Sequence, residues 1–424
     1  MDKLFVIGAG LSGLSLVNEL KEYFNEVIIL EKDSEIGGLC KTKIFSNHFY
    51  EFGPHIIYSK NNRQREWWRS RINIRKKKYF VNLSINGEIK KKNLFDFPLT
   101  RKNLDRIGGN LEPKKSNFEN FEDYMISNLG KKAYRLFVRG YNRKQWGIIP
   151  KKLNLDWSKG KPLKLYDSRK EMFDDENAGA PLSFNNLFHN LIADSKIKVK
   201  YNSKVHRLVK KNSLISKILY SSVSGKRDVL SVKKNDFVVN TAPIDRIMFF
   251  PFKLKWRGVI KLFFLIKSND NIPSYSTTFP NNYFWTRLID YDKQKSISLN
   301  DSLISFAFPY DANYKLREYE KKVLLKQSKN FIQNQLDSKM KDYFFEKEPF
   351  SYPLPSIKNE HKLDEIIEII SKIENFVSLG RLGTFSYISM SKAVSMSLKF
   401  SDYFKNDFSG NKKEFYDLIR NKIW

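Results

Sequence analysis

Residues that build disulfides and metal clusters are scarce in this sequence. Cys40 is the single cysteine among 424 residues, which excludes an intrachain disulfide and a cysteine-based metal cluster. The five histidines show no spacing typical of metal ligands. We therefore expect no metal site, and the lack of disulfides favours a reducing, cytoplasmic setting.

Long hydrophobic runs are absent as well. No segment approaches the ~20 consecutive apolar residues that a membrane-spanning helix needs. The longest apolar stretches, such as residues 260–266, have the length of buried strands. The N-terminal sequence has no basic region ahead of a long apolar run, and glycines interrupt it from Gly8 onward, unlike a signal peptide. These features predict a protein without a transmembrane segment.

Acidic residues are few relative to basic ones, and the formal net charge is +30. Such a charge is compatible with a nucleic-acid or membrane partner. The basic runs are short and scattered, however, and none alternates with aromatic residues as a stacking platform for bases would. We therefore interpret the lysines as solvated surface residues and expect no nucleic-acid partner, although the positive potential would attract an anionic substrate.

The N-terminal sequence has the features of a dinucleotide-binding turn. An apolar strand at residues 4–7 leads into Gly8-Ala9-Gly10-Leu11-Ser12-Gly13, and a helical pattern follows. The glycines permit a tight turn, the approach of a pyrophosphate to the backbone, and close packing of helix on strand. The free N–H groups at the helix start would bind the phosphates. A second apolar strand ends at Glu31, where an acid bonds a ribose hydroxyl.

Further motifs favour FAD over NAD as the dinucleotide. Glu31-Lys32 is followed by Ile36-Gly37-Gly38, an arrangement that resembles the flavin amine-oxidase and mutase superfamily. Residues 238–243 resemble the strand that returns beneath the flavin in that superfamily. By the same resemblance the backbone of Val205 contacts adenine, although Val205 could equally be a core residue of a strand.

Four later motifs resemble one family of that superfamily, the UDP-galactopyranose mutases. They occur in the family's order along nearly the whole chain, and agreement of all four after a flavin motif is not expected by chance. The motifs are Phe52-Gly53-Pro54-His55-Ile56, Gly140-Tyr141-Asn142-Arg143-Lys144-Gln145-Trp146-Gly147, Tyr352-Pro353-Leu354-Pro355 and Gly380-Arg381-Leu382-Gly383-Thr384-Phe385-Ser386-Tyr387.

The resemblance implies an α/β fold in which a Rossmann-type FAD-binding domain carries two insertions, a helical domain and an antiparallel-sheet substrate domain. The three FAD-binding parts would be residues 1–85, 182–248 and 356–424. The helical insertion would be residues 100–155, and the substrate domain residues 249–355. The same motifs would then meet from distant parts of the chain.

The implied activity is the interconversion of pyranose and furanose forms of a nucleotide-diphosphate sugar, such as UDP-galactose. In the family's mechanism, N5 of reduced FAD attacks the anomeric carbon and the diphosphate leaves, with no net redox change. The resemblance thus implies FAD that is active when reduced, NAD(P)H or another reductant for activation, and a supply of furanose for surface polysaccharide. A homodimer is a further possibility.

Motif positions also imply the site residues. Those implied to bind FAD are Gly8, Gly10, Leu11, Ser12, Gly13, Glu31, Lys32, Gly38, Leu39, His55, Val205 and Arg381. Those implied to bind the substrate are Trp146, Lys164, Arg287, Tyr352, Tyr387 and Ser389, and the implied catalytic residues are His55, Arg287, Tyr352 and Tyr387. Alternatives remain open: Arg287 could be a surface charge, Trp146 a core residue, and Tyr352 part of a rigid turn before proline.

Several positions depart from the family pattern, all near the phosphates and the sugar. The second histidine of the GPHIF region is Tyr58 here, and a loop arginine that contacts the diphosphate is Lys164, which keeps the charge but loses the bidentate geometry. The acid of the family's REYP segment is Ala307, and the aspartate after the GRLG motif is Ser389. The base and the sugar of the substrate therefore stay open. We expect residues 157–172 to close over the diphosphate by way of Lys164, and an ordinary charged surface loop is the open alternative.

The alternative function is an FAD-dependent oxidoreductase of the amine-oxidase or desaturase type. Such an enzyme shares the fold and the glycine motifs at the start of the chain. The Gln145-Trp146-Gly147 motif and the tyrosine-bearing motifs favour the mutase. The sequence has no serine elbow and no Cys–His candidate for other catalysis.

Overall fold

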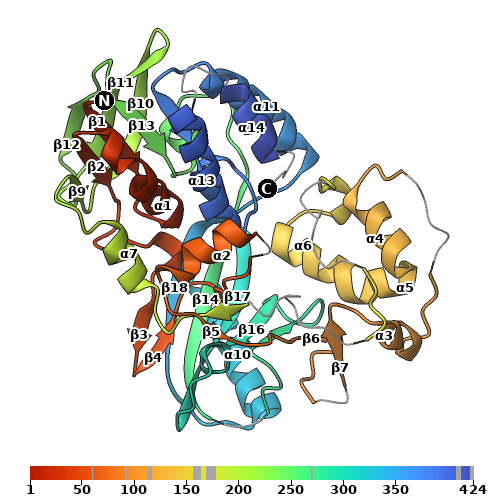
Figure 1. The fold of residues 1–424 in the computed structure, drawn as a ribbon. Coiled ribbons are helices and arrows are strands. Elements are labelled where there is room, and N and C mark those ends of the chain that lie inside the picture. The colour runs from red at the N-terminus through yellow and green to blue at the C-terminus, as the bar shows by residue number, and fades with distance from the viewer. Residues whose placement is uncertain are drawn as a thin grey trace.

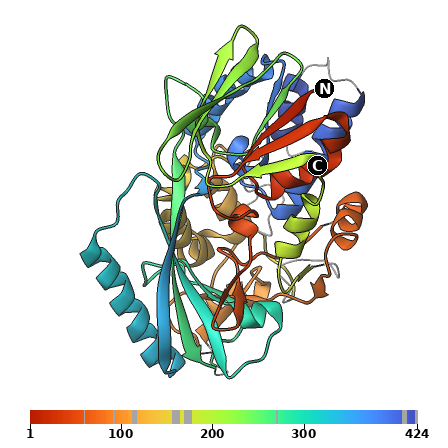
Figure 2. The ribbon, with the colours of Figure 1, turned by 90° about the vertical axis from the view of Figure 1, so that its left-hand side faces the viewer.

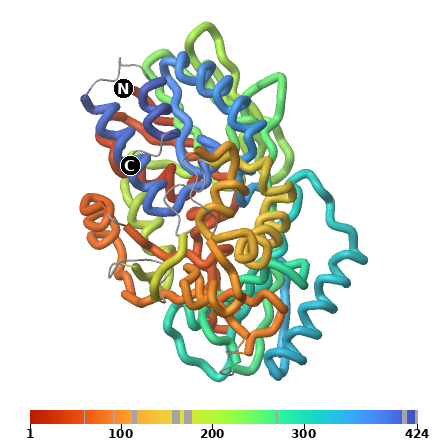
Figure 3. The backbone as a smooth tube through the Cα atoms, turned by 90° about the vertical axis from the view of Figure 1, so that its right-hand side faces the viewer, coloured from red at the N-terminus to blue at the C-terminus, as the bar shows by residue number. Residues whose placement is uncertain are grey.

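The computed structural model describes residues 1–59, 61–90, 93–111, 117–155, 164–168, 178–268, 271–406 and 412–420. Three parts can be followed in Figure 1: a parallel sheet with its helices, a helical part, and a large, mostly antiparallel sheet. Figure 3 shows the helical part, in gold, beside the other two.

Segments from the beginning, middle and end of the chain build the parallel sheet, whose order is β19-β13-β1-β2-β9. The strands are β1 (Lys3–Ile7), β2 (Glu26–Leu30), β9 (Ile197–Lys200), β13 (Phe237–Asn240) and β19 (Phe376–Ser378). All except the edge strand β9 are apolar and almost fully buried, as expected for a parallel sheet covered on both faces. This arrangement confirms the expected Rossmann-type α/β fold.

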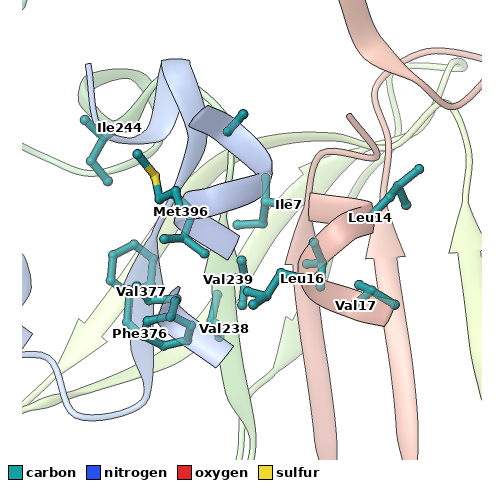
Figure 4. Packing of buried hydrophobic residues seen from close by; sticks show 14 of the residues in the cluster. Ile7, Leu14, Leu16, Val17, Val238, Val239, Ile244, Phe376, Val377 and Met396 are labelled. Carbon is teal, nitrogen blue, oxygen red and sulfur yellow. The ribbon is translucent and has the colours of Figure 1, made fainter. Parts of the chain in front are cut away.

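Helix α1 (Leu11–Leu20) and helix α13 (Met390–Asn406) pack against this sheet and against each other. Figure 4 shows the resulting core: Leu16 of α1 and Met396 of α13 lie with Ile7, Val239 and other strand residues. The side chains of Leu16 and Met396 are fully buried. The core therefore joins the first residues of the chain to its last long helix.

A seven-stranded sheet forms the second part, in the order β18-β14-β17-β16-β15-β6-β7. All neighbouring strands are antiparallel except β15 and β6. The strands are β6 (Val81–Ser84), β7 (Leu94–Phe97), β14 (Trp256–Lys267), β15 (Ser276–Thr278), β16 (Arg287–Asp290), β17 (Asp301–Asp311) and β18 (Met340–Pro353). One face packs on α10 (Glu318–Phe331) and the following π-helical turn, which Figure 2 shows alongside the long strands.

Strands β6 and β7 form a hairpin around Asn86-Gly87, a dipeptide typical of two-residue hairpin turns, but their connection is longer. Ser84 pairs with Leu94, so nine residues separate the strands rather than two. β6 also pairs in parallel with β15, which places residues 81–97 in the large sheet. The limits given above for the FAD-binding and substrate segments stay a prediction.

The region from residue 117 to residue 146 is helical, as its pattern predicts, but it is broken into short pieces. These are α4 (Phe121–Leu129), α5 (Lys131–Ala133), a π-helical turn (Tyr134–Arg139) and α6 (Gly140–Trp146). The remaining helices are α2 (Asn62–Arg69), α3 (Arg101–Arg106), α7 (Asn185–Leu191), α8 (Ile244–Ile247), α9 (Tyr291–Lys295), α11 (Ile357–Ser371), α12 (Gly380–Gly383) and α14 (Lys412–Arg420). Small sheets are made by β3 (Lys43–Phe45) and β4 (His48–Tyr50), by β5 (Arg75–Lys76) and β8 (Gly179–Ala180), and by β10 (Lys204–Lys211), β11 (Leu214–Ser221) and β12 (Arg227–Ser231).

A fully buried ion pair joins the segment after β4 to the large sheet. Lys295, at the end of α9, donates to Oε1 of Glu51 at 2.7 Å, and both side chains are inaccessible. The lysine also donates to the carbonyls of Pro181 and Leu182, and Thr42 donates its hydroxyl to the same carboxylate oxygen. Burial raises the pKa of Glu51 and disfavours its charge. Lys295 and Thr42 oppose this effect and stabilise the charged carboxylate.

We expect Glu51→Gln to destabilise the protein by about 3–5 kcal/mol, because it leaves Lys295 buried without a counter-charge. The matched control is Lys341→Met, which removes the half-exposed pair with Asp301 and should cost less than about 1 kcal/mol. Denaturant unfolding of each variant measures both values. Equal losses in the two variants would contradict a structural role for the buried pair.

Candidate functional site

The glycine turn before α1 has one position that faces open space. Gly8 has a positive φ of 96°, and a side chain on Gly13 would overlap the carbonyl oxygen of Gly8. Gly10, in contrast, has no described atom within 4 Å of where a Cβ would lie. Gly10 is the N-cap of α1, and no side chain caps the helix. The N–H groups of the first turn are therefore left for a ligand at Gly10.

Glu31, at the carboxyl end of β2, is tied to this turn. Its Oε2 accepts a hydrogen bond from the backbone N–H of Ala9 at 2.7 Å, and its Oε1 accepts one from that of Asp33 at 2.9 Å. Burial raises the pKa of Glu31, while these two donors favour the carboxylate. Each oxygen keeps a second lone pair, which suits a ribose hydroxyl.

Val205 lies near Glu31 because the backbone of Ser203, two residues earlier, donates to the carbonyl oxygen of Glu31 at 2.6 Å. The side chain of Val205 is 9% exposed and belongs to the core around the parallel sheet. The side chain of Val205 is thus part of the core. The contact of its backbone with adenine stays a prediction.

The second glycine pair packs directly on the first turn. The backbone N–H of Gly37 donates to the carbonyl of Ala9 at 2.8 Å, and a Cβ on Gly38 would lie 3.3 Å from the Cα of Gly10. Leu39 follows in a short 3-10 helix (Gly38–Cys40). Lys32 is exposed and pairs with Asp33. The two glycine segments therefore form one continuous backbone surface.

The GRLG turn meets the start of α1 from the other side. A side chain on Gly380 would overlap the hydroxyl of Ser12, whose neighbour Leu11 is buried in the core. Arg381 donates to the carbonyl of Ile388 at 2.6 Å and to that of Ser351 at 3.3 Å. The guanidinium of Arg381 is therefore fixed beside the glycine turns.

His55 is half-buried, near enough to Arg381 to feel its charge, and its enclosed Nδ1 lacks a partner among the described residues. Burial, together with the positive charges of Arg381, Lys261 and Lys295, lowers the pKa of His55 to about 3. The ring is thus neutral at physiological pH, with a nitrogen left for a ligand. The open Gly10 position, the carboxylate of Glu31 and this nitrogen together fit FAD.

Arg287 begins β16 on the opposite side of the site, among tyrosines. Its Nη2 lies 3.4 Å from the hydroxyl of Tyr141, and its buried Nε has no partner among the described residues. Tyr141, Tyr275, Tyr352 and Tyr387 all interact with it electrostatically. Arg287 is not a free surface charge, because it is surrounded by aromatic rings and retains unused donors.

Trp146 lies behind two of these tyrosines. Its indole ring is 6.1 Å from the ring of Tyr352 and 5.8 Å from that of Tyr387, in edge-to-face contacts, and only 2% of the residue is exposed. The guanidinium of Arg381 lies 5.6 and 5.4 Å from the same two tyrosine rings. In this structure Trp146 supports the tyrosines, and a direct contact of Trp146 with the substrate stays a prediction.

Two other expected substrate residues lie on exposed positions. The Nζ of Lys164 is 5.4 Å from the ring of Tyr166, and Tyr166 is held by a bridge to Thr100. The remainder of the expected lid, residues 157–163 and 169–172, lies outside the described residues. Ser389 is exposed, and its hydroxyl accepts a hydrogen bond from the backbone N–H of Lys392 at the start of α13. The structure therefore does not bring Lys164 and Ser389 into contact with Arg287.

Two lysines, Lys144 and Lys261, are not among the site residues that the motifs imply. Lys144, in the motif of residues 140–147, donates to the carbonyls of Phe279, Tyr283 and Trp285 at 2.5, 3.1 and 2.8 Å, and thereby ties α6 to the connection that leads to β16 and Arg287. Lys261 is buried in the middle of β14. A lysine between apolar residues was the signal for Lys261, but no local pattern indicates the four carbonyls around Lys144, which are those of Phe279, Asn281, Tyr283 and Trp285.

The residues that the structure describes contain neither a cluster of potential metal ligands nor a helix suited to span a membrane. Those residues contain no group of three or more side chains that could hold a metal ion. They also contain no helix that is both long and apolar enough to cross a membrane.

Comparison with known families gives two matches. Residues 136–345 match the family model described as UDP-galactopyranose mutase, and residues 6–70 match an NAD(P)-binding Rossmann-like domain. The first match contains Trp146, Lys164 and Arg287. The second contains the two glycine motifs and His55. The first match therefore covers the side of the site that carries Arg287, and the second covers the side of the glycine turns.

Two individual relatives with similar sequences are also named as sugar mutases. The chain is 23% identical to the UDP-galactopyranose mutase of Mycoplasma genitalium over 414 residues, which is 93% of each chain. It is 27% identical to the dTDP-fucopyranose mutase of Escherichia coli over 49% of this chain and 58% of that one. A crystal structure of reduced UDP-galactopyranose mutase superposes with a TM-score of 0.77 at 14% identity, covering 98% of this chain and 97% of the other. At that identity the superposition shows a shared fold.

Gly10→Val and Gly13→Ala should separate flavin binding from folding. Valine at position 10 meets only open space, so the protein should fold normally but purify without flavin. Alanine at position 13 meets the backbone of Gly8, so this variant should lower the melting temperature. Absorbance near the flavin bands and thermal unfolding measure the two effects. Normal flavin content in Gly10→Val would contradict the assignment of this turn.

Proposed function

We propose that the chain, as a divergent member of the UDP-galactopyranose mutase family and a flavin-dependent isomerase, interconverts the pyranose and furanose forms of a nucleotide-diphosphate sugar. The observation that carries this proposal is the meeting of two groups of residues. Arg287 interacts with Tyr352 and Tyr387, whose rings lie 5.6 and 5.4 Å from the guanidinium of Arg381. The charge of Arg381 acts in turn on His55, and Arg381 follows Gly380, which packs on Ser12 of the glycine turn. A dinucleotide and a diphosphate could therefore bind within one site.

The dinucleotide side would hold FAD through Gly10, Glu31 and the N–H groups at the start of α1. When bound and reduced, FAD supplies the nucleophile for the anomeric carbon without a net redox change. Neutral His55 leaves Nδ1 for a hydrogen bond at this position and adds no charge next to the reacting carbon. Arg381 is fixed by two backbone carbonyls and keeps the rings of the neighbouring tyrosines in place.

The phosphate side would bind and then stabilise the leaving diphosphate. Arg287 carries a permanent charge and unused donors, and charge-assisted hydrogen bonds to phosphate oxygens are among the stronger ones in proteins. Burial raises the pKa of Tyr387, so its hydroxyl stays protonated and can donate. Arg287 and the hydroxyls of Tyr352 and Tyr387 would therefore favour departure of the diphosphate.

The nucleotide and the sugar are a finer part of the proposal. A UDP-galactose-like substrate follows from the family, but Lys164, Ala307 and Ser389 replace family residues on the substrate side. The matched region of the Escherichia coli relative, a dTDP-fucopyranose mutase, supports testing thymidine as well as uridine nucleotides. We place the enzyme in the cytoplasm, with NAD(P)H or another reductant for activation, supplying furanose for surface polysaccharide.

Redox dependence separates the mutase from the alternative, an oxidoreductase of the amine-oxidase type. We expect sugar interconversion after dithionite reduction under anaerobic conditions, without consumption of reductant in each turnover. The oxidised protein should be inactive. Chromatography of the nucleotide sugars, with a parallel assay for hydrogen peroxide, measures both. Turnover by oxidised protein with release of peroxide would support the oxidoreductase instead.

Arg287→Ala should lose about 2–4 kcal/mol of transition-state stabilisation. At the upper part of that range, kcat/KM falls at least a hundredfold. Flavin content should not change, because Arg287 lies on the substrate side. Arg227→Ala, at an exposed position of β12, is the matched control and should behave as wild type. If Arg287→Ala keeps full affinity for nucleoside diphosphates, Arg287 does not form the diphosphate site.

A further inference from the structure

Strand β14 carries a buried lysine on the face of the large sheet opposite α10. Lys261 is 3% exposed, although its neighbours along the strand, Ile260 and Leu262, turn to the other face and pack in the cluster with α10. The Nζ of Lys261 donates to the hydroxyl of Tyr291 at 2.7 Å. It also lies 5.8 Å from the ring of Phe52, in the motif that contains His55.

The register of the sheet places Lys261 in a row with Arg287. Ala307 of β17 pairs with Lys261 of β14 on one side and with Arg287 of β16 on the other. Directly paired residues point to the same face of a sheet, and two strand spacings amount to about 10 Å. Within this row of paired residues, Ala307 is the one position between Lys261 and Arg287. We call Lys261, Ala307 and Arg287 the cation row.

Neither cation of the row has an acidic partner. Among the described residues, no carboxylate lies within ion-pair distance of Lys261 or Arg287. Glu346 of β18 pairs with Lys261 on the side away from Ala307. Its Oε1 accepts hydrogen bonds from Lys43 at 2.6 Å and from the hydroxyl of Tyr50 at 3.0 Å. Lys261 and Arg287 are like charges in one row. The carboxylates that act electrostatically on Lys261, Glu346 and Glu51, are bonded to Lys43 and Lys295, so a bound anion would relieve the repulsion.

The position of the row points to the substrate. The charge of Lys261 contributes to the low pKa of His55, and Arg287 contributes to lowering the pKa of Lys261 itself. Lys261 therefore lies between the side proposed for the cofactor and the side proposed for the diphosphate. By its resemblance to the family's REYP segment, Ala307 stands where an acid would otherwise occupy the gap.

We propose that Lys261 is a further substrate-binding residue, which together with Arg287 binds an anionic oxygen group of the nucleotide sugar across Ala307. This inference rests on the proposed function, because it assumes that a nucleotide sugar enters the site. The anionic group has two possible sources, the diphosphate itself or a carboxylate on the sugar ring. Both offer the same chemistry to a lysine and an arginine.

Titration of the oxidised holoenzyme with four probes tests the proposal: UDP, dTDP, UDP-galactose and UDP-galacturonate. Lys261→Met should weaken binding roughly tenfold to a hundredfold, the usual effect of losing a hydrogen bond to a charged group. An equal loss for the free nucleotide assigns Lys261 to the diphosphate, and a loss confined to the galacturonate assigns it to a sugar carboxylate. Lys267→Met, at the exposed end of the same strand, should bind as wild type.

Ala307→Glu gives a second, independent variant. A glutamate at position 307 would lie between the two cations and pair with them, so it should weaken binding of the same probe at least as much as Lys261→Met. Lys261→Met itself should fold, because methionine removes a charge from apolar surroundings. Its melting temperature should equal or exceed that of the wild type.

The pH dependence supplies a readout that a merely structural lysine would not give. Burial and the charge of Arg287 lower the pKa of Lys261 to about 7, against the opposing effect of Glu346 and Glu51. Tyr291, which accepts from Lys261, and His55 do not titrate near neutrality, since burial raises the pKa of Tyr291 and lowers that of His55. The free lysine is thus increasingly neutral above about pH 7, while a bound anion favours its charged form.

Affinity for a nucleotide sugar, whose diphosphate diester does not titrate near neutrality, should therefore fall as the pH rises from 7 to 9. Proton uptake should accompany binding in that range. Lys261→Arg, which stays charged, should flatten the profile.

Two outcomes overturn the proposal in distinguishable ways. If Lys261→Met binds all four probes as the wild type does while Arg287→Ala does not, Lys261 is not a ligand of the substrate, and the proposed function still stands. If the wild type binds none of the probes, the proposed function and the inference both fail.

Discussion

The structure depends on holding two differently built sheets at one junction. The parallel sheet is stabilised by helices on both faces, whereas the large sheet is covered by α10 on one face and turns the other toward the site. The buried pair of Glu51 and Lys295 ties the segment that carries His55 to the end of α9, just after the strand of Arg287. Two buried charges are tolerated there because each is satisfied by the other and by further hydrogen bonds. Residues on either side of the site therefore keep a fixed separation.

The two sides of the site differ in how they are built. The dinucleotide side is formed mainly by backbone groups. The turns at Gly10 and Gly38 contact each other, and Glu31 accepts hydrogen bonds from two backbone N–H groups. Such a surface tolerates few side chains, which explains why its motif is intact although the chain is only 23% identical to the mutase of Mycoplasma genitalium. On the substrate side, long side chains such as Arg287 project from sheet strands, where a substitution changes the ligand without disturbing the fold.

Burial sets the charge of the ionisable groups near the reaction centre. It keeps His55 neutral, keeps the hydroxyl of Tyr387 protonated, and lowers the pKa of Lys261 to about 7. Arg287 keeps its charge under the same conditions, because guanidinium does not lose its proton in proteins. A permanent cation, a neutral ring and one lysine of adjustable charge are groups that would suit the proposed reaction, in which a diphosphate leaves and returns.

The sequence by itself determined the parts that depend on local geometry. The order of strand, glycines and helix defined the dinucleotide turn, because few other local structures use that pattern, and the four motifs identified the family and with it FAD. It did not determine the partners of Lys144, the place of Trp146 behind the tyrosines, or the length of the connection at Asn86-Gly87. Nor did it show that Lys261 and Arg287 flank Ala307. Those facts follow from strand register and from contacts between segments far apart in sequence, and only the tertiary structure decides them, because a one-residue change of register would turn each side chain to the opposite face.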